Sequence, residues 1–213
     1  MEAASRGSVS EREAYAEGLR RRSDIIAAGS PPDELPLIGD LLLDGFAHDG
    51  GEPVGVLPVE RHFVNLLRLG PDAHKSPEPT LGDALRLYRK EHLGESDLNT
   101  DSRVVGLANR VVGATVEAME RDPLLTSITR EDARKVRDEM LDRVKVRGRG
   151  VGGKVSPTTV SRELSIIAAV VNFAKVEFGL PDTFQNPFGK LPVARVAKGR
   201  GCGWMKWTRP LLP

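Results

Sequence analysis

The fold of this chain is centred on residues 156–187, which read SPTTVSRELSIIAAVVNFAKVEFGLPDTFQNP. Ser156 is a suitable N-cap, and Pro157 fits the first helical position, where no backbone N–H is needed. Gly179 suits the left-handed residue that follows a helix end. These signals predict one long helix whose start and end are both marked.

The faces of this predicted helix differ in polarity at a period of 3.6 residues. One face is apolar along its whole length and carries Val160, Leu164, Ile167, Val171, Ala174 and Phe178. The opposite face carries Thr158, Arg162, Ser165 and Ala169. A second apolar strip consists of Ile166, Val170 and Phe173. We therefore expect the later turns to lie at the centre of a domain and the first two turns to stay exposed.

A basic, glycine-rich stretch, KVRGRGVGGK, precedes this helix at residues 145–154. Its glycines and Lys154 match the spacing of a phosphate-binding P-loop, but Val155 occupies the position where Ser or Thr must reach a magnesium ion. The stretch also follows a predicted helix, whereas a P-loop follows a strand. The pattern therefore favours a loop between helices, whose Arg and Lys side chains suit a phosphate backbone.

Composition bounds the class of protein. The chain has 213 residues, of which 39% are hydrophobic, 29% charged and 5% aromatic, and this is typical of a helix-rich globular protein. No apolar run is long enough to span a bilayer, and the first residues lack the pattern of a secretory signal. A single cysteine, Cys202, fits a reducing compartment. We expect a cytoplasmic protein with no membrane partner.

The charge is distributed unevenly along the chain. Residues 1–79 carry 8 basic and 14 acidic side chains, whereas residues 80–200 carry 21 basic and 16 acidic ones. Ordinary solvated surface explains such a pattern, and so does a cationic module with an acidic N-terminal appendage. The second interpretation directs a search for nucleic-acid binding to residues 80–200.

Residues 1–78 predict a loosely packed, acidic helical segment. Ser10 and Glu13 have the spacing of a capping box, so a first helix should run to about Ala28. An apolar patch at residues 37–46 and a stretch opened by Pro58 predict two further short helices. Residues 72–79 hold two prolines and read as a linker, which places a domain boundary between residues 78 and 79.

Residues 79–191 predict four helices and no strand, hence an all-α domain. Thr80 caps the first, either Thr100 or Asp101 caps the second, and Thr129 caps the third, in which Asp132 completes a capping box. The apolar positions of the third helix are Ala133, Val136, Met140 and Val144. The helix after Ser156 is the fourth, and residues 192–213 read as an irregular basic tail.

Catalytic and metal-binding patterns are not evident in the sequence. The four histidines, His48, His62, His74 and His92, are scattered, and none forms a cluster with metal-ligand spacing. We predict no cofactor, no metal and no small-molecule substrate. Trp204 and Trp207 lie in the aperiodic tail, where an irregular end is favoured over base stacking.

An ordered set of motifs resembles the core-binding, SAM-like domain of tyrosine recombinases, the phage integrase family. The motifs are Thr80-Leu81, a Leu-x-x-Ile-Thr-x-x-Asp segment at 125–132, Ser-x-x-Thr-Val-x-Arg-x-Leu at 156–164, Phe-Ala-Lys at 173–175 and Asn-Pro-Phe at 186–188. The resemblance covers about residues 79–191. It implies a four-helix domain that clamps double-stranded DNA, with other recombinase subunits as candidate partners, while a separate domain cleaves the strand through a tyrosine.

The resemblance also implies where DNA would bind. The residues concerned are the basic ones of the glycine-rich stretch, the start of the fourth helix and, more weakly, Thr100, Ser102 and Arg103 at the start of the second. The predicted DNA-binding set is Lys145, Arg147, Arg149, Lys154, Ser156, Thr158, Thr159, Arg162 and Arg103.

The chain departs from the family where catalysis is concerned. The catalytic domain of the family needs a His-x-x-Arg pair and a tyrosine nucleophile, yet no histidine here has arginine three residues later. Only 26 residues follow Pro187. We therefore expect a truncated, non-catalytic DNA-binding module. The alternative is a helical protein-interaction or regulatory module that partners another recombinase subunit.

Overall fold

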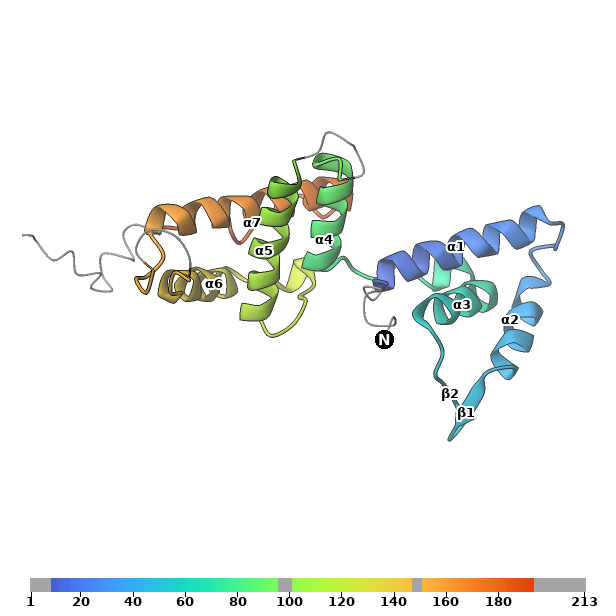
Figure 1. The fold of residues 1–213 in the computed structure, drawn as a ribbon. Helices are drawn as coiled ribbons and strands as arrows, with labels where there is room; N and C mark the ends of the chain where they lie inside the picture. The colour runs from blue at the N-terminus through green and yellow to red at the C-terminus, as the bar shows by residue number, and fades with distance from the viewer. Residues whose placement is uncertain (1–8, 96–100, 147–150, 194–213) are drawn as a thin grey trace, which may run out of the picture. The chain divides into compact units, whose positions relative to one another are not determined.

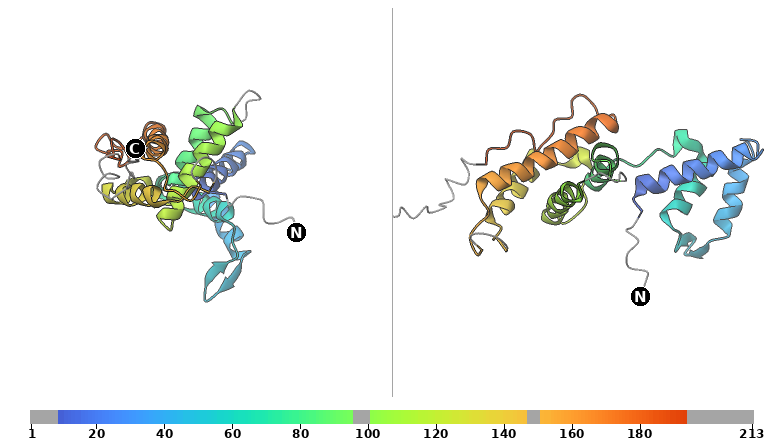
Figure 2. Two further views of the ribbon diagram at one scale, coloured as in Figure 1. Left: turned by 60° about the vertical axis from the view of Figure 1, so that its left-hand side comes forward. Right: turned by 45° about the horizontal axis from the view of Figure 1, so that its top comes forward.

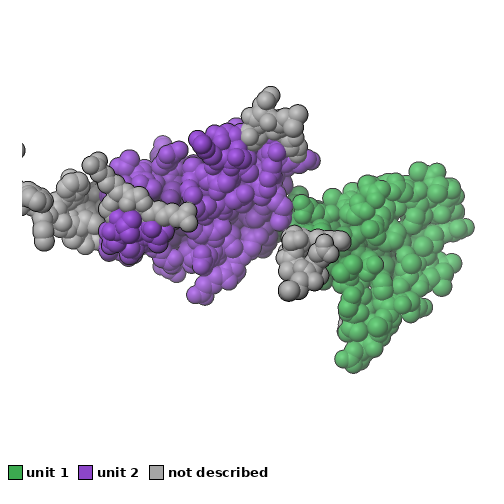
Figure 3. All heavy atoms as spheres, viewed as in Figure 1, with its two compact units in different colours: residues 1–79 green, residues 80–213 purple. Residues whose placement is uncertain are grey.

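The computed structural model describes residues 9–95, 101–146 and 151–193, which divide into two compact units at Pro79 and Thr80 (Figure 3). The described residues are mostly helical, and the only strands among them form one small hairpin. This mostly helical composition agrees with the predicted all-α class. Within the described residues, no helix has the length and apolar character that crossing a membrane requires.

In unit 1, residues 1–79, the described residues form three helices and the hairpin (Figure 1). Their bounds are α1, Glu11–Ala27; α2, Leu35–Asp44; β1, Ala47–Asp49; β2, Glu52–Val54; and α3, Pro58–Ala73. The capping box predicted from Ser10 and Glu13 is present at the start of α1. Helix α3 packs against both α1 and α2, so this segment is a compact unit and not the loose assembly that the sequence suggested.

The hairpin was not predicted from the sequence. The conformation of its turn explains why the two strands pair. Strands β1 and β2 are antiparallel, with Ala47 opposite Val54 and Asp49 opposite Glu52. The two residues between them, Gly50 and Gly51, have φ angles of 58° and 88°. Two successive left-handed residues make the turn whose twist matches paired strands, and glycine adopts that conformation without steric cost. Figures 1 and 2 show the hairpin projecting from the helices of its unit.

Unit 2, residues 80–213, is built around α7 (Figure 1). Its elements are α4, Leu81–Leu87; a π-helical turn, Tyr88–His92; α5, Ser102–Ala118; a 3-10 turn, Leu125–Ser127; α6, Arg130–Asp142; and α7, Pro157–Glu177. Thr80 and Thr129 make the predicted capping boxes, and Asp101 rather than Thr100 caps α5. Among the described residues, each of these α-helices begins at a cap that the sequence predicted.

Helix α7 contributes the largest share of the core of unit 2. Its buried apolar side chains are Val160, Leu164, Ile167, Val170, Val171 and Ala174. They pack with Leu81 and Ala84 of α4, Val111 and Val112 of α5, and Ala133, Val136 and Met140 of α6. This confirms that α7 is central to its domain.

The chain after α7 is also part of this core. Asn186 donates from Nδ2 to the Ala168 carbonyl oxygen and to Asn172 Oδ1, both at 2.8 Å. Its own Oδ1 accepts from the Phe188 N–H, and the Phe188 side chain is only 2% exposed. Arg130 of α6 donates to the Pro187 carbonyl oxygen at 2.6 Å. The Asn-Pro-Phe motif therefore fastens the returning chain to α6 and α7.

Candidate nucleic-acid interface

The start of α7 positions the first group of predicted DNA-binding residues. Ser156 Oγ accepts from the Thr159 N–H at 3.2 Å and lies 2.9 Å from Thr159 Oγ1. The Ser156 and Thr159 hydroxyls are thus both used in the N-cap of α7. Pro157 occupies the first helical position, where no backbone N–H is needed. Thr158 is exposed. Of the three hydroxyl residues, Thr158 is the one that the cap leaves to face an external ligand.

Arg162 lies one turn beyond Thr158 on the same exposed face of α7. Within the described part of the chain its guanidinium makes no hydrogen bond or ion pair. An exposed arginine next to the positive end of a helix dipole creates a locally positive surface. This surface can accept an anion without breaking an existing contact.

The glycine-rich stretch lies in the connection between α6 and α7, as predicted, and its described ends pair with each other. Val144 and Lys154 form an antiparallel bridge, and the backbone of Lys145 exchanges hydrogen bonds with Gly152 and Gly153 at 3.0 and 2.9 Å. We call residues 143–155 the basic arm. The prediction that Val144 continues the third helix is wrong: α6 ends at Asp142, and Arg143 turns to extended backbone and accepts from the Val155 N–H. Pairing across the arm satisfies backbone groups that a longer helix would otherwise have satisfied.

Two ion pairs lie at the base of the basic arm. Lys154 Nζ lies 2.7 Å from Asp142 Oδ1, and Arg143 Nη2 lies 2.6 Å from Glu163 Oε2. The first pair is exposed on both sides, whereas Glu163 is buried on α7. Arg143 therefore attaches the arm to α7, while Asp142 partly neutralises Lys154. Nothing in the local sequence signalled either pair, because the partners lie 12 and 20 residues apart.

Lys145 is half-buried on the arm, and no ion pair to it occurs among the residues that the structure describes. Arg147 and Arg149 lie outside the described residues, as does Thr100. The predicted positions that the structure describes on the arm and the first two turns of α7 are thus Lys145, Lys154, Ser156, Thr158, Thr159 and Arg162.

Arg103 is not part of this group. It lies in the first turn of α5, where its backbone N–H donates to the cap residue Asp101 at 2.9 Å and its side chain is exposed. In Figure 1, α5 begins beside α4 and the end of α7, while the start of α7 lies at the other end of that helix. The contact of Phe173, late in α7, with Tyr88 and His92 agrees with this placement.

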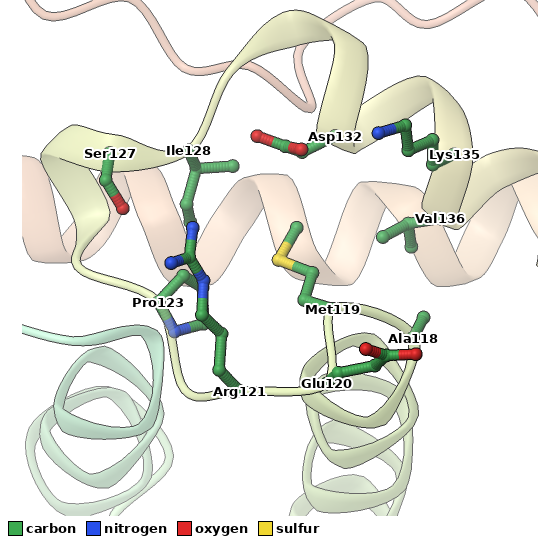
Figure 4. Close-up of a pocket in the computed structure, with 10 residues that line it drawn as sticks. All are labelled: Ala118, Met119, Glu120, Arg121, Pro123, Ser127, Ile128, Asp132, Lys135 and Val136. Atoms are coloured by element: carbon green, nitrogen blue, oxygen red, sulfur yellow. The ribbon is translucent and has the colours of Figure 1, made fainter.

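A small cavity of about 180 Å³ lies between the end of α5 and the start of α6 (Figure 4). Met119 and Arg121 point toward it from below, and Asp132 and Lys135 flank it on α6. Hydrogen bonds from the Thr129 hydroxyl and backbone hold the pKa of Asp132 below its usual value. The charges of Lys135 and Arg121 lower that pKa further, and Glu120 adds a second carboxylate to the lining of the cavity.

Unit 1 holds a group of titratable side chains that sequence reasoning missed. Glu11, His62 and His74 form a continuous chain of hydrogen bonds, although the histidines are 12 residues apart in the sequence. In the described part of the chain, no three His, Cys, Asp or Glu side chains are arranged to hold a metal ion.

Comparison with protein-family models, with curated proteins and with solved structures gave no match. The likeness to the recombinase core-binding domain therefore stays a prediction that rests on the motifs of this sequence.

Proposed function

We propose that unit 2 is a double-stranded DNA-binding module of the tyrosine recombinase type, without catalytic activity of its own. The observation that carries this proposal is Arg162, which is exposed and has no partner among the described residues, on the same face as Thr158 in the first two turns of α7, which follow the basic arm. Arg162 and Lys145 would contact phosphates, and Thr158 would add a hydrogen bond. Phosphate contacts of this kind position a protein on the duplex without reading its sequence.

The ion pairs of the arm refine this assignment. Lys154 is engaged by Asp142, so its ammonium must be shared or released before it can contact a phosphate. Arg143 is engaged by Glu163, which supports a structural role for it in holding the arm. Arg103 would be reached only by a duplex that extends along unit 2 to the start of α5.

The test is a fluorescence anisotropy titration of the full chain on duplex DNA at several salt concentrations. Affinity should fall as salt rises. The logarithm of the association constant should decrease linearly with the logarithm of the salt concentration, with a slope of about 0.9 in magnitude for each phosphate contacted. Arg162→Ala should weaken binding and reduce that slope by about 0.9. Arg20→Ala removes the same charge from α1 in unit 1, where Arg20 is paired with Glu17 and Asp24, and should leave the slope unchanged.

Asp142→Asn provides a test of opposite sign. The amide keeps the size of the side chain but removes the charge that engages Lys154, so binding should tighten at low salt and the slope should rise. Salt-independent binding, or no binding even at low salt, would contradict the proposal.

A second candidate function, association with another protein subunit, is favoured by the surface of α2. Leu37 and Leu41 lie one turn apart and are 63% and 65% exposed. Asp33, Glu34 and Asp44 are exposed around them. If this face recruits another subunit, Leu41→Ser should abolish cooperative binding to DNA that carries two sites and leave binding to one site unchanged. Val176→Ser, at a position of α7 that is 75% exposed, is the control.

A further inference from the structure

Three titratable side chains of unit 1 form a hydrogen-bonded chain between α1 and the two ends of α3. Glu11 Oε2 lies 2.8 Å from His62 Nε2, and His62 Nδ1 lies 2.8 Å from His74 Nε2. The His62 side chain is only 7% exposed. Glu11 is also bound by Arg61 at 2.7 Å, so its carboxylate receives two cationic or proton-donating partners from α3.

The proton arrangement in this chain follows from the partners. An ionised carboxylate only accepts, so His62 Nε2 must carry a proton toward Glu11. When His62 is neutral, its Nδ1 accepts and His74 Nε2 donates. One additional proton is accommodated if His62 becomes the donor on both sides and the proton of His74 moves to its Nδ1.

A second additional proton cannot be accommodated. Both facing ring nitrogens would then carry hydrogen, and two imidazolium rings would stand at hydrogen-bonding distance with no acceptor between them. Burial, together with the charges of His62 and Arg61, lowers the pKa of His74. The hydrogen bond from Arg61 is the largest of the causes that lower the pKa of Glu11 and keep it ionised.

His74 is also the residue that fastens the end of α3 to α1. Its backbone N–H donates to the Gly70 carbonyl oxygen at 3.0 Å, and its carbonyl oxygen accepts from the Tyr15 hydroxyl at 3.0 Å. Gly70 has a φ of 75°, so α3 is kinked where its last turn begins. Three residues farther on, the Pro77 carbonyl oxygen accepts from the Arg12 guanidinium. Side chains of α1 thus hold the segment that leads to Thr80.

We propose that His62 and His74 form an acid-released latch that holds residues 74–79 on α1. Protonation of both rings breaks their hydrogen bond and frees the last turn of α3 and the residues after it. Those six residues, once extended, span about 20 Å. Acid would therefore lengthen the tether between the two units without unfolding either core.

The charged and titratable groups around the latch come from each packed element. Helix α1 contributes Glu11, Arg12 and Tyr15, and α3 contributes Arg61. On the α2 side of α3, Asp40 is paired with Arg68 at 2.6 Å. Lys75 and Glu78 belong to the held segment itself. Only the two histidines have ordinary pKa values near neutral pH, so they set the range in which the latch responds.

The direction of the pH effect follows from the lowered pKa of His74. Once the segment is released, His74 binds protons at its ordinary value of 6.5, whereas the latched form resists protonation. The latch is therefore fully stable above that value and weakens as the pH falls from 6.5 toward the lower pKa of the latched form. Glu11 acts in the same direction at lower pH, because its contribution is complete above its ordinary pKa of 4.5 and is lost as the pH falls from there toward its lowered pKa in the latched form.

The experiment is amide hydrogen exchange and imidazole NMR on the full chain at about pH 7.5 and about pH 5.5, on either side of the ordinary histidine pKa. The protection factor of the His74 amide, corrected for intrinsic exchange, should fall about tenfold, because about pH 5.5 lies roughly one unit below the ordinary histidine pKa and each unit changes proton occupancy tenfold. At the higher pH both rings should show the Nε2–H tautomer. Equal protection at the two pH values, or independent titration of the rings, would overturn the proposal.

Variants distinguish the response of the His62–His74 pair from a non-specific destabilisation of the protein at low pH. His74→Gln places an amide that can donate to or accept from His62, so protection at this site should become the same at both pH values. His48→Gln, at an exposed hairpin position, should retain the acid response of the wild type. Tyr15→Phe removes the hydrogen bond from the Tyr15 hydroxyl to the His74 carbonyl oxygen and should lower protection at both pH values. A His74→Gln protein that still loses protection in acid would rule out the latch.

Discussion

Both units bury apolar side chains, but the contacts between helices inside unit 1 differ from those inside unit 2. In unit 2, α7 buries a continuous row of aliphatic side chains against α4, α5 and α6. In unit 1, α1 and α3 approach so closely at Gly18 that an added Cβ would lie 2.9 Å from the backbone nitrogen of Phe63. Beside this contact run the ion pair of Glu11 with Arg61 and the histidine chain.

The difference shows which features of a fold a sequence can reveal. A row of apolar residues has a period, so the buried face of α7 can be identified from the sequence alone. A close approach of two backbones has no period, because one glycine is sufficient for it. Hydrogen bonds and ion pairs between residues far apart in the sequence also follow no sequence period. The following changes separate the two kinds of packing.

The largest effect is expected from Ile167→Ala, which empties a fully buried position in the middle of α7. The lost transfer free energy and the residual cavity should lower the free energy of unfolding of unit 2 by about 2–5 kcal/mol. Urea denaturation followed by circular dichroism measures the change. Val176→Ala on the same helix removes atoms from a side chain that is 75% exposed and should have little effect.

Gly18→Ala should destabilise unit 1 by about 1–3 kcal/mol, because the new methyl group meets backbone atoms that cannot turn away. Hydrogen exchange of α1 and α3 amides would localise the loss to this unit. If the variant were as stable as the wild type, the close approach of α1 and α3 would not be a feature of the protein in solution.

Thr129→Ala should lower the stability of unit 2 by about 1 kcal/mol, since it removes the cap of α6. Serine restores the hydroxyl, so Thr129→Ser should recover most of the loss. Thermal unfolding of the three proteins under one set of conditions makes the comparison. Equal stability of the alanine and serine variants would show that the hydroxyl contributes nothing.

Gly113→Ala should have the smallest effect and the opposite sign. Gly113 lies exposed within α5 with no atom near the position of an added Cβ, so alanine relieves the entropic cost of glycine in a helix. Stability should rise by about 0.5–1 kcal/mol. The same substitution thus destabilises at Gly18 and stabilises at Gly113, and denaturation of both variants tests whether backbone proximity decides between them.

Much of the helical framework was predictable from short-range signals. Ser10, Thr80, Thr129 and Ser156 each cap the helix that the sequence assigned to them. Gly179, with a φ of 61°, follows the end of α7 as expected. Such signals are reliable because a cap and its backbone partner lie within three residues of each other.

The features that the sequence did not predict depend on contacts between residues that are distant in the sequence. Val144 continues the apolar spacing of α6, yet it pairs with Lys154 because the arm returns on itself. Of the candidate interface, the exposed Thr158 and Arg162 were predictable from the polar face of α7. The engagement of Lys154 by Asp142 was not, because the charge sequence does not say which groups meet.

The sequence by itself determined that the chain is helical, where its main helices begin, and that α7 lies at the centre of unit 2. Local hydrogen bonds and apolar periodicity carry that information. Only the tertiary structure decided that the glycine-rich stretch is a paired arm, that α1 and α3 meet at a glycine, and that His62 meets His74. Each of these depends on the distance between residues far apart in the chain, which packing sets and local sequence does not encode.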